Sequence, residues 1–451
     1  MFNNILHIKP SAKNISINFS AIIFSKKTVL NAIVLLSFFP FLALIPGITA
    51  EVQPYCYIVC VMFVFLFKEK LPINYYYYFA IVIAYFLFYF IFKAYNHFDF
   101  AAIPHLIIFI GPPLFFIILF KFRNSISLKS IHIIFYLYVA TGFIQQFFPL
   151  FFSITGLKPI LEFLIPRFQV AKMEEFGNRG VTSLTNEPSY AAMIFFASFL
   201  GVIFRFIKKE ITQKTFFYNL VLFSASILFN ASLTSFILTF FILIAYIVYR
   251  RKYLASMIFL VVLILPFILF DTGLRVIDLL ATFPDLMNAF NWSLYDVLVG
   301  PLGSIREFSS WVGIKSAFFH PFGNGYYSAL TQFIEVAKSI HIDISKVTFF
   351  MAEKGGYINM KPAGFSSLIL FELGVIPFLL INTVVWTCFY KVYQKRGAFA
   401  RFGVPIFCLS WALLNFDSLS SLPSLWFALV ISLQIIQYKN NNISLAQNSN
   451  L

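Results

Sequence analysis

The sequence contains two arginines whose neighbours suit them to binding an anion. Arg179 lies in the segment 176–180, which reads Phe-Gly-Asn-Arg-Gly, and the flanking glycines allow the backbone to approach a ligand closely. Arg306 lies in the first turn of a helix predicted from residue 304 to about 319, where free amide hydrogens attract negative charge. A guanidinium is a planar fork of donors that fits a phosphate. The two arginines predict a diphosphate site, although each also fits an ordinary solvated arginine.

Two further residues could act as a general base that removes a proton from a hydroxyl group. Glu187 lies in Asn-Glu-Pro at 186–188, and His320 precedes the turn Pro-Phe-Gly-Asn-Gly. Each also has a structural interpretation, because Glu187 could cap a helix that begins at the next proline and His320 could bind carbonyls at a helix end. His341 is a second histidine candidate. The predicted catalytic residues are therefore Arg179, Glu187, Arg306 and His320.

The predicted helix 304–319 carries more than its arginine. Its first residues, Ser-Ile-Arg-Glu, fit a capping box. Its apolar residues form one stripe and its smaller residues another, which predicts an amphipathic helix lying on the membrane surface. Lys315 on this helix is a further cation for a diphosphate. Tyr326, after the turn, could stack on a sugar ring or belong to the aromatic belt at the membrane interface.

These residues belong to a chain whose composition requires a membrane. Of its 451 residues, 60% are hydrophobic and 11% are charged, and the mean hydropathy is +0.85. A soluble protein has about 25% charged residues, so this chain cannot cover a soluble surface. We predict a single all-α integral membrane domain over 1–451, with about twelve transmembrane helices of roughly 20 residues each. The predicted segments are 29–49, 52–67, 75–93, 101–120, 131–154, 189–206, 216–231, 233–249, 253–270, 364–389, 402–417 and 422–438.

The basic residues predict the orientation of these segments. The net charge is +15, and most of the 33 Lys and Arg residues fall in the two terminal segments and every second gap, accompanied there only by Glu69 and Glu210. Under the positive-inside rule these segments and both termini are cytoplasmic. The charge excess is then a topology signal and does not predict nucleic acid. Two long segments remain outside, 155–188 and 271–363, and we expect the protein to work there.

Other chemistry has little basis in the sequence. Motifs for nucleotide hydrolysis, zinc proteolysis and serine hydrolysis do not occur, and the four cysteines lack His or acidic partners at metal-binding spacing. We therefore expect no cofactor and no metal. His105 and Glu372 are the main candidates for charge within the membrane, where ion-coupled transporters place it. We expect Glu372 to face the interior of the helix bundle.

Three stretches carry a resemblance to a known family. They are Arg179 with the Asn-Glu-Pro-Ser of 186–189, the helix from Arg306 with the His-Pro-Phe-Gly-Asn-Gly of 320–325, and the Phe-Glu-Leu-Gly-Val of 371–375. Together with about twelve spans and a late, long external loop, they resemble the O-antigen or oligosaccharide repeat-unit polymerases, which are related to the O-antigen ligases. The resemblance departs at Arg167, which is followed by a glycine one position earlier than in the paired pattern of some members.

The resemblance implies a GT-C-like membrane glycosyltransferase of the bacterial plasma (inner) membrane. Its substrate would be a glycan on undecaprenyl diphosphate at the periplasmic or outer face, polymerised without a nucleotide or a required metal. Arg179 and Arg306 would bind the diphosphate, with Lys315 and Tyr326 as further substrate contacts. Membrane lipid, a flippase and a chain-length regulator are the candidate partners.

Two alternatives stay open. A ligase that moves finished glycan onto an acceptor needs the same donor site. A lipid-linked oligosaccharide flippase, or another transporter, would also be a hydrophobic chain of about twelve spans.

Overall fold

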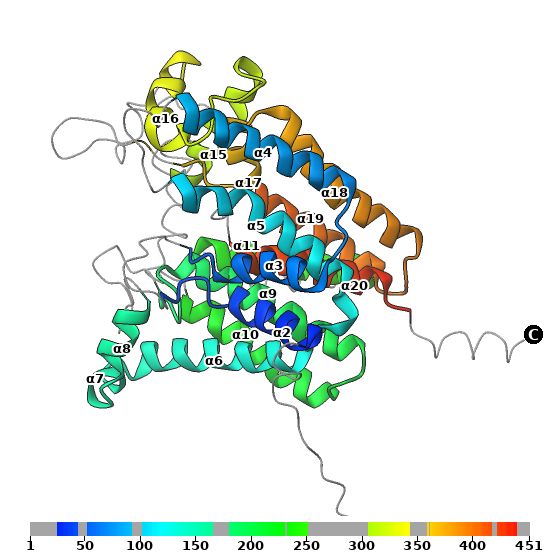
Figure 1. Ribbon diagram of the computed structural model, residues 1–451. Helices are drawn as coiled ribbons and strands as arrows, with labels where there is room; N and C mark the ends of the chain where they lie inside the picture. Colours follow the sequence, from blue (N-terminus) through cyan, green and yellow to red (C-terminus); the bar gives the residue numbers. More distant parts are fainter. Residues whose placement is uncertain are drawn as a thin grey trace, which may run out of the picture.

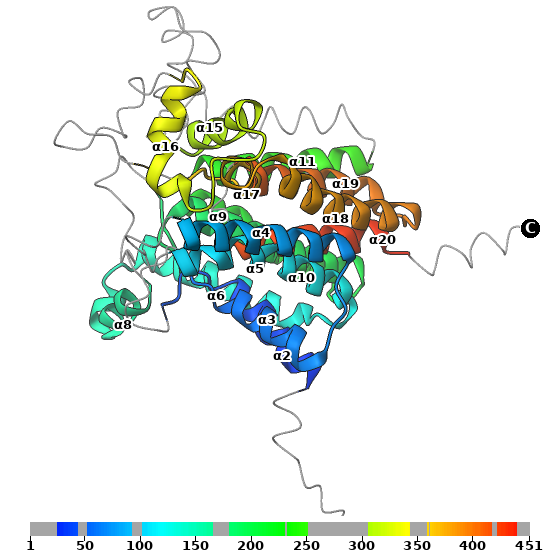
Figure 2. The same cartoon turned by 45° about the horizontal axis from the view of Figure 1, so that its top comes forward.

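The computed structural model describes residues 25–43, 52–92, 102–165, 180–230, 232–250, 305–342, 359, 361–416 and 422–439. Every regular element within these ranges is a helix. The long helices lie side by side in one bundle, and α8, α15 and α16 lie toward one of its ends (Figures 1 and 2). The predicted segment 253–270 lies outside the described residues, and so does most of 271–363.

The helices follow the predicted apolar segments closely. Each predicted segment that falls in the described residues contains a helix. In chain order they are α2 (Lys26–Ser37), α3 (Tyr55–Phe67), α4 (Ile73–Phe92), α5 (Ala102–Lys121), the 3-10 turn η1 (Arg123–Ser125), α6 (Leu128–Phe147), α7 (Phe151–Ile154), α8 (Leu157–Leu164), α9 (Pro188–Ile207), α10 (Gln213–Asn230), α11 (Leu233–Arg250), α15 (Ile305–Phe319), α16 (Ser328–Ser339), α17 (Phe365–Glu372), α18 (Val375–Gln394), α19 (Ala400–Phe416) and α20 (Pro423–Gln437).

Five of the described helices are long and apolar enough to cross a membrane: α4, α5, α6, α9 and α18. Four shorter apolar helical stretches accompany them, at Tyr55–Phe67, Ile237–Tyr249, Ala400–Asn415 and Pro423–Gln437. A helix satisfies its own backbone hydrogen bonds, which is the condition for lying in hydrocarbon. The predicted all-α membrane character is confirmed at this level.

Three helix boundaries differ from the predicted segments. The segment 364–389 is two helices, α17 and α18, because the chain breaks at Gly374, which has a φ of +84°. The long helix in segment 131–154 ends at Phe147, before the short helix α7, and the helix in segment 29–49 ends at Ser37. Both stops lie within three residues of a proline, at positions 149 and 40. A proline disfavours helical backbone in the residue before it, so an apolar run continues in sequence after its helix has ended.

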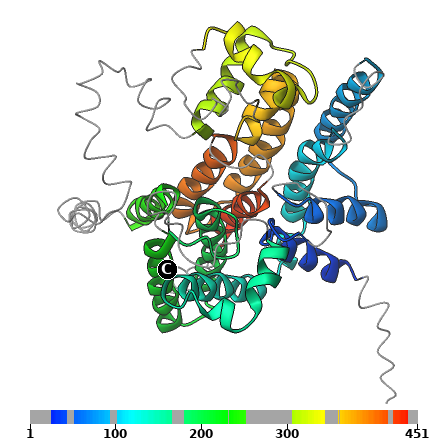
Figure 3. The ribbon, with the colours of Figure 1, turned by 90° about the vertical axis from the view of Figure 1, so that its left-hand side faces the viewer.

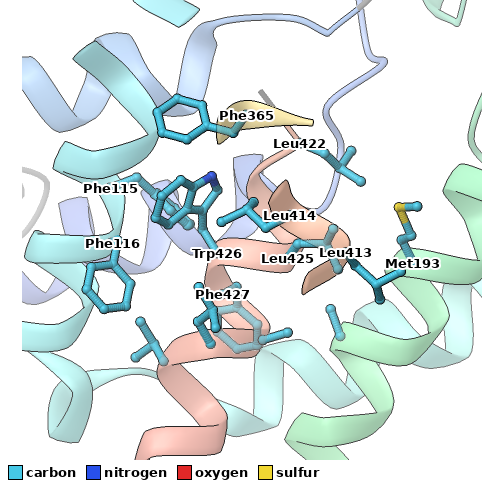
Figure 4. Packing of buried hydrophobic residues seen from close by; sticks show 14 of the residues in the cluster. Phe115, Phe116, Met193, Phe365, Leu413, Leu414, Leu422, Leu425, Trp426 and Phe427 are labelled. Atoms are coloured by element: carbon cyan, nitrogen blue, oxygen red, sulfur yellow. The ribbon is translucent and has the colours of Figure 1, made fainter. Parts of the chain in front are cut away.

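The core of the bundle is built on α9 and α20. Every residue of α20 from Pro423 to Ile436 is buried, and α9 is buried along almost all of its length. A helix that is apolar on all sides can be enclosed by other helices or by lipid, and α9 and α20 are enclosed by helices. Figure 4 shows Trp426 of α20 among Phe115 and Phe116 of α5, Phe365 of α17 and Leu414 of α19, with Met193 of α9 facing Leu413.

The periphery of the bundle is formed in part by α4 and α18, which pack against each other. Seen end-on in Figure 3, α4 and α5 stand together at one side of the bundle. Large apolar side chains on α4 and α18 are exposed, among them Phe88 (63%), Ile91 (62%) and Leu379 (54%). Such surfaces on helices of 20 residues suit contact with lipid.

Candidate functional site

Two of the three stretches that carry the resemblance are joined backbone to backbone. The amide of Asn324 donates to the carbonyl of Phe371 (2.8 Å), and the amide of Gly325 donates to the carbonyl of Glu372 (3.0 Å). In the opposite direction, the amide of Val375 donates to the carbonyl of Pro321 (2.8 Å). The turn after α15 and the break between α17 and α18 therefore form one unit, although about fifty residues separate them in sequence.

Glycines make this contact possible. Gly323 has a φ of +76°, and a Cβ atom there would lie 2.4 Å from the carbonyl oxygen of Glu372. Gly374 has a φ of +84°, and a Cβ atom there would lie 2.3 Å from the carbonyl oxygen of Pro321. Any other residue at these two positions would combine an unfavourable backbone conformation with a steric overlap.

The carboxylate of Glu372 is fully buried at the centre of this unit. Its Oε2 accepts a hydrogen bond from the amide of Tyr327 (2.9 Å), and its Oε1 accepts one from the amide of Ala329 (3.1 Å), so that it caps the first turn of α16. The Nε2 atom of His105 on α5 lies 2.9 Å from the same Oε2, and that side chain is 1% exposed. The prediction that Glu372 faces the bundle interior is confirmed.

Aromatic rings surround the pair of His105 and Glu372. Tyr326 donates its hydroxyl to the carbonyl of Ala102 (2.6 Å), and its ring lies edge-on to His105 and to Phe86. Only 4% of Tyr326 is exposed. Stacking on a sugar needs an accessible ring face, so this burial corrects the prediction that Tyr326 contacts a glycan or lies in an interfacial belt. Its role in the structure is to fasten the 320–326 turn to α5.

Helix α15 has the extent that the sequence predicts. Two of its serines accept hydrogen bonds from the chain before α17, Ser309 from the Ala363 amide (3.1 Å) and Ser310 from the Gly364 amide (3.2 Å). Gly313 lies against the Ser367 carbonyl, 2.5 Å from where its Cβ would be. The small-residue stripe is therefore a packing face, while Trp311, Phe318 and Phe319 of the same helix stay exposed.

The predicted residues of this region fall at opposite ends of α15. Arg306 is in its first turn, while His320 follows its last residue, with its amide donating to the Ser316 carbonyl (2.7 Å). Fourteen residues of helix rise span roughly 21 Å. His320 and Lys315 are both partly exposed. The side chain of Arg306 and the proposed capping box lie outside what the structure describes, as do Arg167 and Arg179.

The third stretch, which precedes α9, is held by buried polar side chains. Gln145 of α6 accepts from the Ser183 amide (2.7 Å) and donates to its carbonyl (3.2 Å). Asn230, at the end of α10, donates to the carbonyls of Val181 (3.1 Å) and Pro188 (2.7 Å). These amides hold the segment 180–188 against α6 and α10, so the start of α9 has a fixed position.

Glu187 occupies the N-cap position of α9, with Pro188 as its first helical residue, as the capping interpretation predicts. Its carboxylate, however, makes no capping hydrogen bond to the backbone. One of its oxygens lies 3.4 Å from the Ser189 hydroxyl, and the residue is partly exposed. Glu187 therefore occupies the capping position, but its carboxylate does not accept a hydrogen bond from the first turn of α9.

Hydrophobic contacts connect the starts of α9, α17 and α20. Phe365, the first residue of α17, lies edge-on to Trp426 near the start of α20, with ring centroids 5.2 Å apart. Ser366 is hydrogen-bonded to Asn415 of α19. Met193, in the second turn of α9, faces the same cluster (Figure 4). Since the first half of α15 packs on the start of α17, the helix end that carries Arg306 lies toward this group.

The pairing of His105 with Glu372 is the contact that the sequence did not disclose. Each was recognised as a costly charge within the membrane, and such groups usually occur in pairs. That rule could have predicted the contact, because His105 and Glu372 are the only strong candidates for charge in the predicted spans away from the span ends. The sequence offered a weaker indication that Gln145 and Asn230 hold the segment before α9, since each is an amide side chain inside an apolar run.

No protein-family model and no curated protein matches this chain. Among the described residues no group of three His, Cys, Asp or Glu side chains could hold a metal ion. Fold and site together define a class, an all-helical protein with helices able to cross a membrane, in which two loop segments close around one buried carboxylate.

Proposed function

We propose that this chain is a GT-C-like glycosyltransferase of about twelve spans in the bacterial plasma membrane. It would polymerise oligosaccharide repeat units carried on undecaprenyl diphosphate at the outer face. The observation that carries the proposal is the packing of the 320–325 turn onto 371–375, because two stretches chosen by resemblance alone are joined by backbone hydrogen bonds. The third stretch supports the proposal because hydrogen bonds from Gln145 and Asn230 hold the segment 180–188 in place before α9.

The proposed reaction transfers a growing glycan to a new lipid-linked repeat. A sugar hydroxyl of the acceptor attacks the anomeric carbon of the donor glycan, and a carbon–oxygen bond forms. The bond from that carbon to the diphosphate breaks, and undecaprenyl diphosphate leaves with the electron pair. The guanidinium groups of Arg179 and Arg306 would stabilise the charge that develops on the leaving group.

The helix geometry favours Glu187 over His320 as the base next to this diphosphate. A base has to reach the acceptor hydroxyl at the reacting carbon, within hydrogen-bond distance. His320 is separated from Arg306 by the length of α15, roughly 21 Å. Glu187 begins α9, whose second turn shares the hydrophobic cluster with the start of α17. We assign Glu187 to proton removal, and Lys315, about midway, to longer-range attraction of the substrate.

The lipid-linked glycan profile of a deletion strain tests the function. If the proposal holds, single lipid-linked repeats accumulate, the native chain restores long polymer, and Arg179→Ala or Arg306→Ala fails to restore it. Arg396→Ala, on an exposed residue after α18, is the matched control and should restore full length. Normal chain length with Arg306→Ala would reject the site.

The same profile separates the alternatives. Accumulation of finished polymer on the lipid carrier would identify a ligase. Repeats retained on the inner leaflet would identify a flippase. The pair of His105 and Glu372 gives no support to ion coupling, because the Glu372 carboxylate is already engaged in capping α16.

A further inference from the structure

A polar cavity lies at the other end of the bundle, where α5, α9 and α20 finish. Its volume is about 380 Å³, within the range of small-molecule sites. Three cationic residues line it, Arg123, Lys208 and Lys439. Asn124, Gln434, Gln437 and Tyr438 supply further polar groups. None of the described lining residues is acidic, so the cavity has a strong excess of positive charge.

Arg123 is held in a defined orientation at this cavity. Its Nη1 donates to the Phe120 carbonyl (2.8 Å) and its Nη2 to the Oε1 of Gln437 (2.9 Å). A guanidinium has five N–H donors, more than these contacts use. Burial lowers the pKa of Arg123, because a desolvated cation loses the stabilisation of water. A bound anion would restore that stabilisation.

The side chain of Gln434 adds an independent observation. Its Nε2 donates to the Arg123 carbonyl, which fixes the orientation of the amide. Its Oε1 is buried and has no hydrogen-bond partner among the described residues, and the whole residue is 7% exposed. Buried acceptors are almost always satisfied. An acceptor beside three cations indicates a ligand that brings a hydroxyl or amine donor together with its negative charge.

We propose that this cavity binds a phosphate ester that carries a neighbouring hydroxyl or amine, such as the headgroup of an anionic phospholipid. The phosphate would lie among Arg123, Lys208 and Lys439, and the donor would reach Gln434. Lys208 also pairs with Glu210 (2.9 Å), but both side chains are about one third exposed, so Lys208 can turn toward a ligand. The positive-inside prediction places this end at the cytoplasmic leaflet, where anionic lipids attract cations.

Two variants of the full-length chain provide the test. Lys208→Gln with Lys439→Gln removes two exposed lining charges, and Lys391→Gln with Lys395→Gln removes two exposed charges at the end of α18, outside the cavity. The purified proteins are titrated with phosphatidylglycerol in phosphatidylcholine nanodiscs, and with glycerol phosphate in detergent, while thermal unfolding is followed. Each lost cation should weaken binding about fivefold, or roughly 25-fold for the pair.

The outcomes are distinct. Stabilisation by phosphatidylglycerol alone, lost in the cavity variant and kept in the control, assigns a lipid headgroup. Stabilisation by glycerol phosphate with the same pattern assigns a soluble phosphate ester. No stabilisation by either probe, or equal weakening in both variants, would overturn the proposal. Glycan polymerisation does not enter this measurement, so its result is independent of the function proposed for the opposite end.

Discussion

The Nε2 atom of His105 lies 2.9 Å from the Oε2 atom of Glu372, between side chains that are 1% and 0% exposed. The same carboxylate accepts the amides of Tyr327 and Ala329. One side chain on α17 thus joins the start of α16 to α5. Glu372 therefore holds the start of α16, and the turn before it, against α5.

Replacing Glu372 with Gln should destabilise the protein strongly. The amide keeps the shape of the side chain but loses one of the two acceptor oxygens, and a buried donor left without an acceptor costs about 1–3 kcal/mol. We expect a clear fall in the thermal midpoint of the detergent-solubilised chain. Glu162→Gln is the control, because Glu162 forms an exposed pair with Lys158 at 3.8 Å and should change stability by less than about 1 kcal/mol. Equal midpoints for both variants would contradict this role of Glu372.

Alanine at Gly374 should be far more damaging than alanine at Gly325. Both glycines have positive φ, +84° and +99°, which costs an alanine about 1–2 kcal/mol. A Cβ at Gly374 would overlap the Pro321 carbonyl, whereas a Cβ at Gly325 meets no atom within 4 Å. The difference in thermal midpoint between the two variants therefore reports the close approach together with the backbone conformation of Gly374, whose ψ is −167°. If it vanishes, the contact between the turn and the helix break is not as close as described.

Glu69 should contribute stability that depends on pH. It is paired with Lys26 of α2 and Lys121 of α5. Burial tends to raise the pKa of this carboxyl, but hydrogen bonds and charge from the two lysines outweigh it and lower the pKa below the ordinary 4.5. A lowered folded pKa means that the stabilisation is complete above pH 4.5 and is lost as the pH falls through the folded value.

Thermal unfolding of the native chain and Glu69→Gln between pH 7 and pH 3 checks this sign. We expect the native chain to be more stable by about 1–2 kcal/mol near neutral pH, with the gap closing below pH 4.5. A gap that stays constant or widens in acid would show that Glu69 is not stabilised as a carboxylate.

Glu187→Gln should abolish polymer while the chain still folds. Gln keeps the shape of the side chain and can still accept from the Ser189 hydroxyl, whereas loss of a general base slows a reaction by about 10²–10⁴. His320→Gln should retain polymer, because His320 lies at the far end of α15 from Arg306. Chain length in complemented cells and thermal midpoints of the purified variants are the two measurements. Full-length polymer with Glu187→Gln would exclude it as the base.

The sequence predicted helices better than it predicted contacts. Hydropathy located α5, α9 and α20 because enclosed helices are apolar on all sides. It missed the break at Gly374, since Phe371, Leu373 and Val375 keep the run apolar across it. The limits of α15 were correct, but its small residues were interpreted as the weaker side of a surface helix. Whether such a stripe faces a membrane or another helix depends on a partner, α17, that lies far away in sequence.

The sequence predicted the separate stretches of the candidate site, and the fold shows which of them are in contact. Resemblance selected 320–325 and 371–375 separately, and the structure joins them through Glu372. It also separates Arg306 from His320, a distance that follows from helix rise once both ends of α15 are known. The enclosure of Tyr326 depends on α4 and α5 and so could not be deduced locally.

The anchoring by Glu372 has a consequence for genetic screens. An acidic residue in an apolar span, whose every replacement removes activity, would ordinarily be assigned to the chemistry of the enzyme. Here the same result would arise if the turn at 320–325 and the start of α16 no longer packed on α5. Suppressor mutations should therefore cluster on α5 and α16, the two helices that meet this carboxylate, and would map the architecture of the protein instead of its reaction.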